Sequence, residues 1–162
     1  MGAIVLQHEV DESSLLLDLS CQPEQVDAAT LEERFFVWPV RWRCDGVDLF
    51  DWSFNPGTPW WSLPALGFGT RCLDAFRSVR EFGEHWMRLP GGGWLRWTNA
   101  CGVVTIECSI SGRSFRLHAA DLAVAVQHYR AGVAQDLISR YPRMALHGSW
   151  RHWDSRVPRA VT

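Results

Sequence analysis

The first third of the chain carries apolar and polar positions in short runs and alternations that predict β-strands. Two apolar-rich runs, AIVLQHEV (3–10) and SLLLDLSC (14–21), are separated by the polar residues DES and predict two strands, which could pair as a hairpin. The following segment, QPEQVDAATLEE (22–33), is a polar connector with a weak tendency to form a helix after Asp27. We therefore expect the domain to open with strands and to contain little helix before residue 34.

The segment RFFVWPVRWRC (34–44) alternates strictly between its two faces, as a half-buried strand does. Asp45 and Gly46 supply the positive φ of a tight turn, and VDLFDWSF (47–54) is predicted to return as the partner strand. Because Pro39 cannot donate a hydrogen bond to a neighbouring strand, we expect the first strand to lie at a sheet edge or to carry a bulge there.

A long helix is predicted between Ser62 and Gly83, after a loop NPGTPWW. Ser62 is expected to cap it, Pro64 falls in its first turn, where a missing N–H does no harm, and Gly83 suits its C-terminal end. Apolar residues recur near helical spacing between these points, although Gly67 and Gly69 lower the helix propensity of the first half.

The second half predicts a meander followed by a helix. Three or four short strands (HWMRL, GWLRWT, GVVTIECSI and RSFRLH) are joined by the turn-forming segments PGGG, NACG and SG. The helix AADLAVAVQHYRAGVAQDLISRYP (119–142) follows directly and ends at Pro142. The order of elements predicts a single α+β domain over 1–162, with a largely antiparallel sheet, two main helices on one face and an irregular tail over 143–162.

Composition indicates a soluble globular protein, since hydrophobic residues make up 47% and charged residues 21% of the chain. The start has no basic segment ahead of its short apolar run, and no apolar run reaches the length of a membrane span, so we expect a cytoplasmic protein that is not bound to a membrane. The five cysteines are odd in number and include no C-x-x-C, which favours reduced and mostly buried thiols.

Charge is distributed unevenly along the chain. Residues 1–33 hold eight acidic side chains and no arginine, while all sixteen basic residues are arginines in the rest of the chain. One interpretation is that the two ends of the domain neutralise each other. The other is that the acidic segment steers a basic partner.

Sequence motifs for catalysis are missing. The chain has no G-x-S-x-G, no phosphate-binding P-loop, no dinucleotide fingerprint and no H-E-x-x-H. His147 and His152 lie five residues apart without a nearby cysteine, so we expect no metal site and no cofactor. Cys108 and His118 could approach across a hairpin, but a buried thiol is the better interpretation because no orienting group is evident.

The ten tryptophans separate into two sets. Five occur in strand-like alternation and are expected to build the core: Trp38, Trp42, Trp52, Trp86 and Trp94. Five lie near predicted loops or in the tail, where core packing explains them less well: Trp60, Trp61, Trp97, Trp150 and Trp153. Tryptophan beside arginine is typical of protein–protein hot spots. It also suits single-stranded nucleic acid, but the chain has no basic excess, so we expect no nucleic-acid partner.

The layout resembles that of small cytosolic proteins of bacterial toxin–immunity loci. The segments that carry the resemblance are RCDGVDLF, WWSLPAL, VVTIECSI and LISRYP, and together they span roughly residues 34–143. The resemblance implies a one-domain α+β protein without enzymatic activity, which neutralises a cognate toxin by covering its active site.

Three hypotheses for function follow. The first is an immunity-type, protein-binding inhibitor whose partner contacts are Trp60, Trp61, Trp97, Glu12, Asp18 and Asp51. The second is a small-molecule-binding protein or enzyme with a pocket between sheet and helices, lined by Trp38, Trp42, Trp86, Trp94, His118 and His128. The third is a structural subunit of a phage or secretion particle. The sequence leaves the oligomeric state open.

Overall fold

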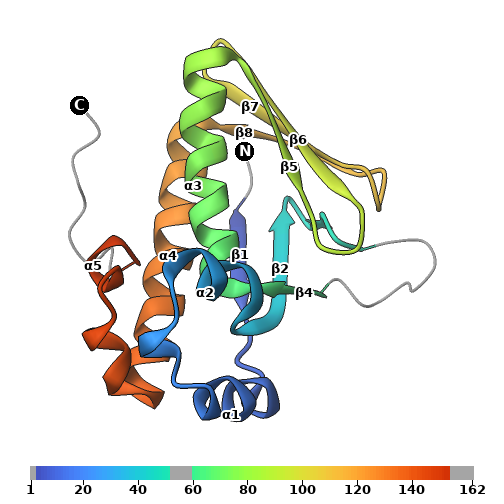
Figure 1. Ribbon diagram of the computed structural model, residues 1–162. Coiled ribbons are helices and arrows are strands. Elements are labelled where there is room, and N and C mark those ends of the chain that lie inside the picture. The colour runs from blue at the N-terminus through green and yellow to red at the C-terminus, as the bar shows by residue number, and fades with distance from the viewer. Residues whose placement is uncertain (1–2, 52–59, 154–162) are drawn as a thin grey trace.

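The computed structural model describes residues 3–51 and 60–153, which form two antiparallel sheets and two long helices (Figure 1). The strands are β1 (Ile4–His8), β2 (Val37–Cys44), β3 (Val47–Asp48), β4 (Trp60–Pro64), β5 (Glu84–Arg88), β6 (Trp94–Ala100), β7 (Val103–Cys108) and β8 (Ser114–His118). The helices are α1 (Glu12–Ser20), α2 (Ala28–Arg34), α3 (Ala65–Phe82), α4 (Ala119–Arg140) and α5 (Trp150–Trp153), with the short 3-10 helices η1 (Pro23–Gln25) and η2 (Pro142–Leu146). The predicted α+β class is confirmed, with α3 and α4 as the main helices packed on the sheets.

Several sequence expectations fall on residues that the structure does not describe. They are the core position of Trp52, the loop residues 55–59 and the end of the tail beyond residue 153.

The first sheet is built around β2, which pairs with β1 along one side and with β3 and β4 along the other. The expectation that this strand lies at an edge is therefore wrong. Pro39 is tolerated because its carbonyl accepts a hydrogen bond from the N–H of Glu9 (2.9 Å), one residue past the end of β1. The position of its missing N–H therefore points toward β1 at the residue where the pairing of β1 with β2 has ended, so no hydrogen bond of the sheet is lost. The tight turn at Asp45 and Gly46 is confirmed, with φ of 51° and 82°.

The second sheet is the predicted meander, in the order β5-β6-β7-β8. Side chains alternate across it: Leu95, Trp97 and Val104 face the core and are completely buried, whereas their neighbours along the strands are not. The helices α3 and α4 lie side by side and the second sheet packs beside α3 (Figure 1). One face of the meander therefore contributes to the core.

The two sheets share a single core that is largely aromatic. The ring centroids of Trp42 in the first sheet and Trp97 in the second lie 5.6 Å apart. Phe68 of α3 and Phe115 of β8 make edge contacts to Trp42 at 6.1 and 6.4 Å. Aromatic rings prefer such tilted and edge-to-face arrangements. The cluster therefore packs favourably, and it joins the first sheet, the second sheet and α3.

Helix α3 differs from expectation at its start but not at its end. Ser62 lies in β4, and Pro64 is the N-cap of α3, without a side-chain hydrogen bond to the first turn. Gly83 ends the helix in the left-handed conformation (φ 81°), as predicted.

The segment 14–21 was expected to be a strand, and that expectation is wrong. It forms most of α1, because the side chain of Asp11 accepts hydrogen bonds from the N–H groups of Ser13 (3.0 Å) and Ser14 (3.1 Å). This is an N-cap, which satisfies donors that a helix start otherwise leaves free. Of the three consecutive leucines only Leu15 is buried. The weak helix after Asp27 is confirmed as α2, and Asp27 caps it through Thr30.

The tail is more ordered than predicted, as far as residue 153. It forms η2 and α5, and it buries Met144, Trp150 and Trp153. The indole of Trp153 donates a hydrogen bond to the carboxylate of Glu32 in α2. The ring of His147 lies 2.7 Å from the backbone oxygen of Val26. The tail therefore closes over α2 and the segment before it, and both tryptophans belong to the core.

Candidate functional site

The structure corrects the prediction for one of the three tryptophans expected to meet a partner. Trp97 lies in β6, not in a loop, and none of its side chain is exposed. It offers no surface to another protein. Trp60 and Trp61 lie in β4 and are partly buried. Trp61 faces the core, 6.0 Å from Phe50, and the guanidinium of Arg41 lies 5.8 Å from the ring centroid of Trp60.

The three carboxylates predicted as partner contacts are each engaged within the chain. Glu12 accepts a hydrogen bond from Arg140 (3.2 Å), and Asp51 accepts one from Arg113 (2.9 Å). Asp18 accepts the backbone N–H of Phe36 (2.7 Å), a buried residue with a φ of 54°. Partial burial raises the pKa of Asp18. Partner contact by Trp60, Trp61 and these carboxylates stays a prediction.

Acidic residues of the first 33 positions also pair with arginines near the C-terminal end. Besides Glu12 with Arg140, Glu24 lies 2.7 Å from Arg143. These pairs agree with the interpretation that the two ends neutralise each other.

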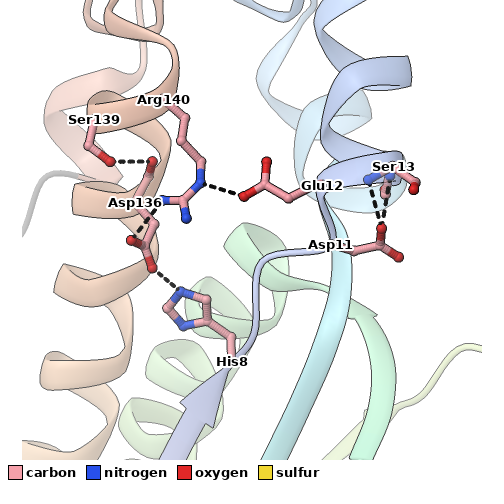
Figure 2. Close-up of polar contacts among 8 residues, drawn as sticks. His8, Asp11, Glu12, Ser13, Asp136, Ser139 and Arg140 are labelled. Atoms are coloured by element: carbon pink, nitrogen blue, oxygen red, sulfur yellow. Dashed lines mark hydrogen bonds and ion pairs between the residues drawn. The ribbon is translucent and has the colours of Figure 1, made fainter.

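A polar cluster of side chains from β1, α1 and α4 is shown in Figure 2. The ring of His8 lies 2.7 Å from a carboxylate oxygen of Asp136, and Arg140 donates hydrogen bonds to both Asp136 (3.2 Å) and Glu12 (3.2 Å). The His8 ring stacks on Trp38, with centroids 5.5 Å apart, and meets Tyr129 edge-on at 5.6 Å. Burial lowers the pKa of His8, although Asp136 acts to raise it.

A histidine held by a carboxylate is half of a general-base arrangement, whose other half is a nucleophile within hydrogen-bond reach of the ring. The His8 side chain is only 8% exposed and its neighbours are aromatic rings. Among the described residues, no serine, threonine or cysteine side chain hydrogen-bonds to its ring. The cluster is therefore suited to holding β1 and α1 onto α4.

The six residues expected to line a pocket do not gather in one place. Trp38 and Trp42 are completely enclosed in the core. Trp86 is 52% exposed on β5, and Trp94 is partly buried beside it on β6. The two histidines, His118 and His128, are both exposed.

An unpredicted cluster lies on the face of the second sheet that points away from the core. We call this surface the outer face of β5–β8. It consists of Glu84, Trp86, Arg88, Trp94, Arg96, Thr98, Ala100, Val103, Thr105, Glu107, Ser114, Arg116 and His118, all exposed or partly exposed. Trp86 and Trp94 meet edge-on at 4.7 Å, and the guanidinium of Arg96 lies 5.4 Å from the Trp86 ring centroid. Helices α3 and α4 do not cover this face, because they pack against the other side of the sheet.

Charge on the outer face is partly paired. Arg96 donates a hydrogen bond to Glu84 (2.7 Å) and lies 3.5 Å from Glu107, and the Glu84 contact raises the pKa of Arg96. Arg88 and Arg116 are exposed and form no ion pair with any residue that the structure describes. Three arginines against two glutamates give this face a net charge of +1, and Arg88 and Arg116 are its two arginines without an acidic partner among the described residues.

The sequence held a signal for this face. Trp94 and Trp97 are an odd number of positions apart in GWLRWT, so a strand must place them on opposite faces. Opposite faces are compatible with a buried Trp94 and an exposed Trp97, but the structure shows the reverse arrangement, with Trp97 enclosed in the core and Trp94 on the outer face. Alternation along β5 and β6 therefore places Trp86 and Trp94 on one face of the sheet and Trp97 on the other.

Cys44, Cys72 and Cys108 are buried, all five cysteines are free of disulfides, and burial raises the pKa of Cys72. Cys108 faces the core and His118 is exposed near the other end of the β7–β8 pairing, so they do not form a pair. Within residues 3–51 and 60–153, no three His, Cys, Asp or Glu side chains are placed to bind a metal ion. No helix in these ranges is long and apolar enough to cross a bilayer.

Comparison with protein-family models, with curated proteins and with solved structures finds no match to this chain.

Proposed function

We propose that this chain is a non-enzymatic protein-binding module, an immunity-type inhibitor whose contact surface is the outer face of β5–β8. The observation that carries the proposal is the pair Trp86 and Trp94 with Arg96 over the Trp86 ring, on a sheet face that no described element covers. Tryptophan and arginine are the residue types most enriched at the energetic centres of protein interfaces.

Physical chemistry favours a macromolecular partner for this surface. A large aromatic side chain that stays 52% exposed gives up the free energy that its burial would supply. The sheet holds Trp86 and Trp94 in fixed positions, so a partner that buries them has little side-chain entropy to remove. An open sheet face also suits the extended contact of two proteins better than it suits the enclosed site of a small molecule.

The inhibitor role extends this binding function. The expectation comes from the resemblance of four segments to proteins of toxin–immunity loci. Such an inhibitor needs only to bind tightly over its target, and it needs no catalytic groups of its own. The polar clusters described above, which serve to hold the fold together, are compatible with that role.

The test is the affinity of the chain for the product of the adjacent gene. Trp86→Ala is expected to weaken the complex by about 2 kcal/mol, or about 30-fold in Kd, as for a central interface aromatic. The folded state should be unaffected, because more than half of the Trp86 side chain is already in solvent. Isothermal titration calorimetry gives the affinity, and thermal unfolding checks the fold.

Leu146→Ala is the matched control, because Leu146 is a large apolar residue, 75% exposed, on η2 rather than on the sheet. An equal loss of affinity for both variants would argue against the outer face as the contact surface. Absence of any complex between the purified proteins, together with no effect of the chain on the activity of its neighbour, would reject the inhibitor role.

A further inference from the structure

The outer face of β5–β8 carries a charge pattern that restricts the chemistry of its partner. Both acidic residues on this face, Glu84 and Glu107, lie against Arg96. Two further arginines, Arg88 and Arg116, are exposed and are without an acidic partner among the described residues. Arg96 offsets one of the two carboxylate charges, and the three arginines and two glutamates together leave the face with a net charge of +1. The arginines that are free to meet a carboxylate of a partner are Arg88, beside the tryptophans, and Arg116, on the far strand.

Strand register fixes where these arginines lie. Arg88 on β5 is directly opposite Trp94 on β6, so it borders the aromatic pair. Arg116 lies on β8, the far edge strand, opposite Thr105. With strands about 4.8 Å apart and a rise of about 3.3 Å per residue, the two arginines are separated diagonally by roughly 20 Å. That distance fits within the surface that one partner covers in a standard interface.

From this pattern we infer that the partner is an acidic protein surface, which places carboxylates on Arg88 and Arg116 and an apolar group on Trp86. The inference rests on the proposed protein-binding function and adds the chemistry of the partner. Arginine pairs with carboxylates through two parallel hydrogen bonds, so two separated arginines also fix the orientation of the partner. This sign of charge is opposite to the basic partner that the acidic first 33 residues suggested.

A nucleic acid fits this face less well, although tryptophan and arginine on an open sheet could also stack bases and bind phosphates. The guanidinium of Arg96 already occupies the region over the Trp86 ring, and Trp94 packs edge-on against it. Glu84 and Glu107 lie on the same face and would repel a phosphate backbone. A protein can place its carboxylates away from these glutamates, whereas a strand of regularly spaced phosphates cannot.

The experiment uses three probes of defined charge with the full chain. They are a twelve-residue peptide of repeated Glu-Glu-Trp, the matching peptide of Arg-Arg-Trp, and a twelve-residue oligothymidylate. Binding is followed by the NMR signals of the indole N–H groups of Trp86 and Trp94, with Trp60 as an internal reference on the other sheet. The acidic peptide is expected to shift the Trp86 and Trp94 signals, and to shift them less at high salt because the arginines are exposed.

The double variant Arg88→Glu with Arg116→Glu is expected to weaken binding of the acidic peptide about tenfold, since two exposed contacts turn repulsive. Arg77→Glu with Arg80→Glu is the matched control, because both arginines are exposed on α3, outside the outer face. It should leave the titration with the acidic peptide unchanged.

The possible failures are distinguishable. If the basic peptide shifts Trp86 and Trp94 more than the acidic peptide does, the acidic partner is refuted while the protein-binding function stands. Stronger binding of oligothymidylate at the same signals would refute both in favour of nucleic acid. If neither peptide moves these signals, the inference is overturned, and the effect of Trp86→Ala on the complex with the adjacent gene product then decides the function separately.

Discussion

At the scale of single residues, His8 combines burial with a hydrogen bond to a carboxylate, and the two act on its pKa in opposite directions. Burial disfavours the charged ring and Asp136 favours it, and the net result is a pKa below the ordinary value of 6.5. Stacking on Trp38 and the edge contact to Tyr129 explain why the ring is withdrawn from water. The neutral imidazole is therefore the form that the fold prefers.

This preference makes stability depend on pH in a defined direction. Because the folded state has the lower pKa, the unfolded state binds more protons below pH 6.5, and the free energy of unfolding falls as the pH drops from 6.5 toward the folded-state pKa. We expect His8→Gln to remove that part of the slope, measured by urea unfolding at several pH values between 7 and 5. His128→Gln, at an exposed position of α4, is the control. An unchanged slope in His8→Gln would show that the ring does not titrate as its surroundings require.

At the scale of elements, two glycines in α3 decide how closely its neighbours approach. A Cβ built on Gly67 would lie 1.8 Å from the backbone oxygen of Glu32 in α2, and one on Gly69 would lie 2.8 Å from Cγ of Arg130 in α4. From the sequence these glycines only lowered the helix propensity. In the structure they allow α2 and α4 to pack against the first half of α3.

The contact at Gly67 predicts that replacing this helix glycine with alanine lowers the stability of the protein, which is the opposite of the usual effect. Glycine to alanine in a helix interior normally stabilises by up to about 1 kcal/mol. Gly67→Ala is expected instead to destabilise the protein by about 3 kcal/mol or more, because the obstructing atom is backbone and cannot rotate away. Chemical denaturation measures the change. Gly148→Ala, where nothing lies within 4 Å of the added carbon, should change stability little. A stabilised Gly67→Ala variant would mean that α2 does not pack as described.

Element prediction succeeded where periodicity was long and failed where local capping or tertiary contact decided the outcome. Strict alternation over 34–44 and the turn-separated runs after residue 84 gave β2 and the meander. The leucine run of α1 has no clear period, and the cap at Asp11 made it a helix. The tail tryptophan Trp153 contacts Glu32 of α2, and His147 contacts Val26, each across more than a hundred residues of sequence. No pattern within a short stretch of sequence could predict those contacts.

At the scale of the whole molecule, the candidate site depends on which faces the two sheets turn toward their common core. From the sequence, tryptophan beside arginine is expected to form the contact surface. The same analysis, however, assigns Trp97 to the surface and Trp86 with Trp94 to the interior. The shared core encloses Trp42 and Trp97. Trp86 and Trp94 occupy strand positions that point to the other face of the second sheet, so they lie outside the core. Of the acidic residues expected to contact a partner, Glu12 and Asp51 pair with arginines of the same chain.

Hydroxyl-radical footprinting of the chain, alone and in complex with the product of the adjacent gene, tests most directly whether the outer face of β5–β8 is the binding surface. Mass spectrometry then reports the oxidation of individual aromatic side chains. We expect oxidation of Trp86 to fall severalfold in the complex, while Phe82, which is 73% exposed at the end of α3, stays as reactive as in the free chain. A complex in which Trp86 keeps its full reactivity would contradict the account.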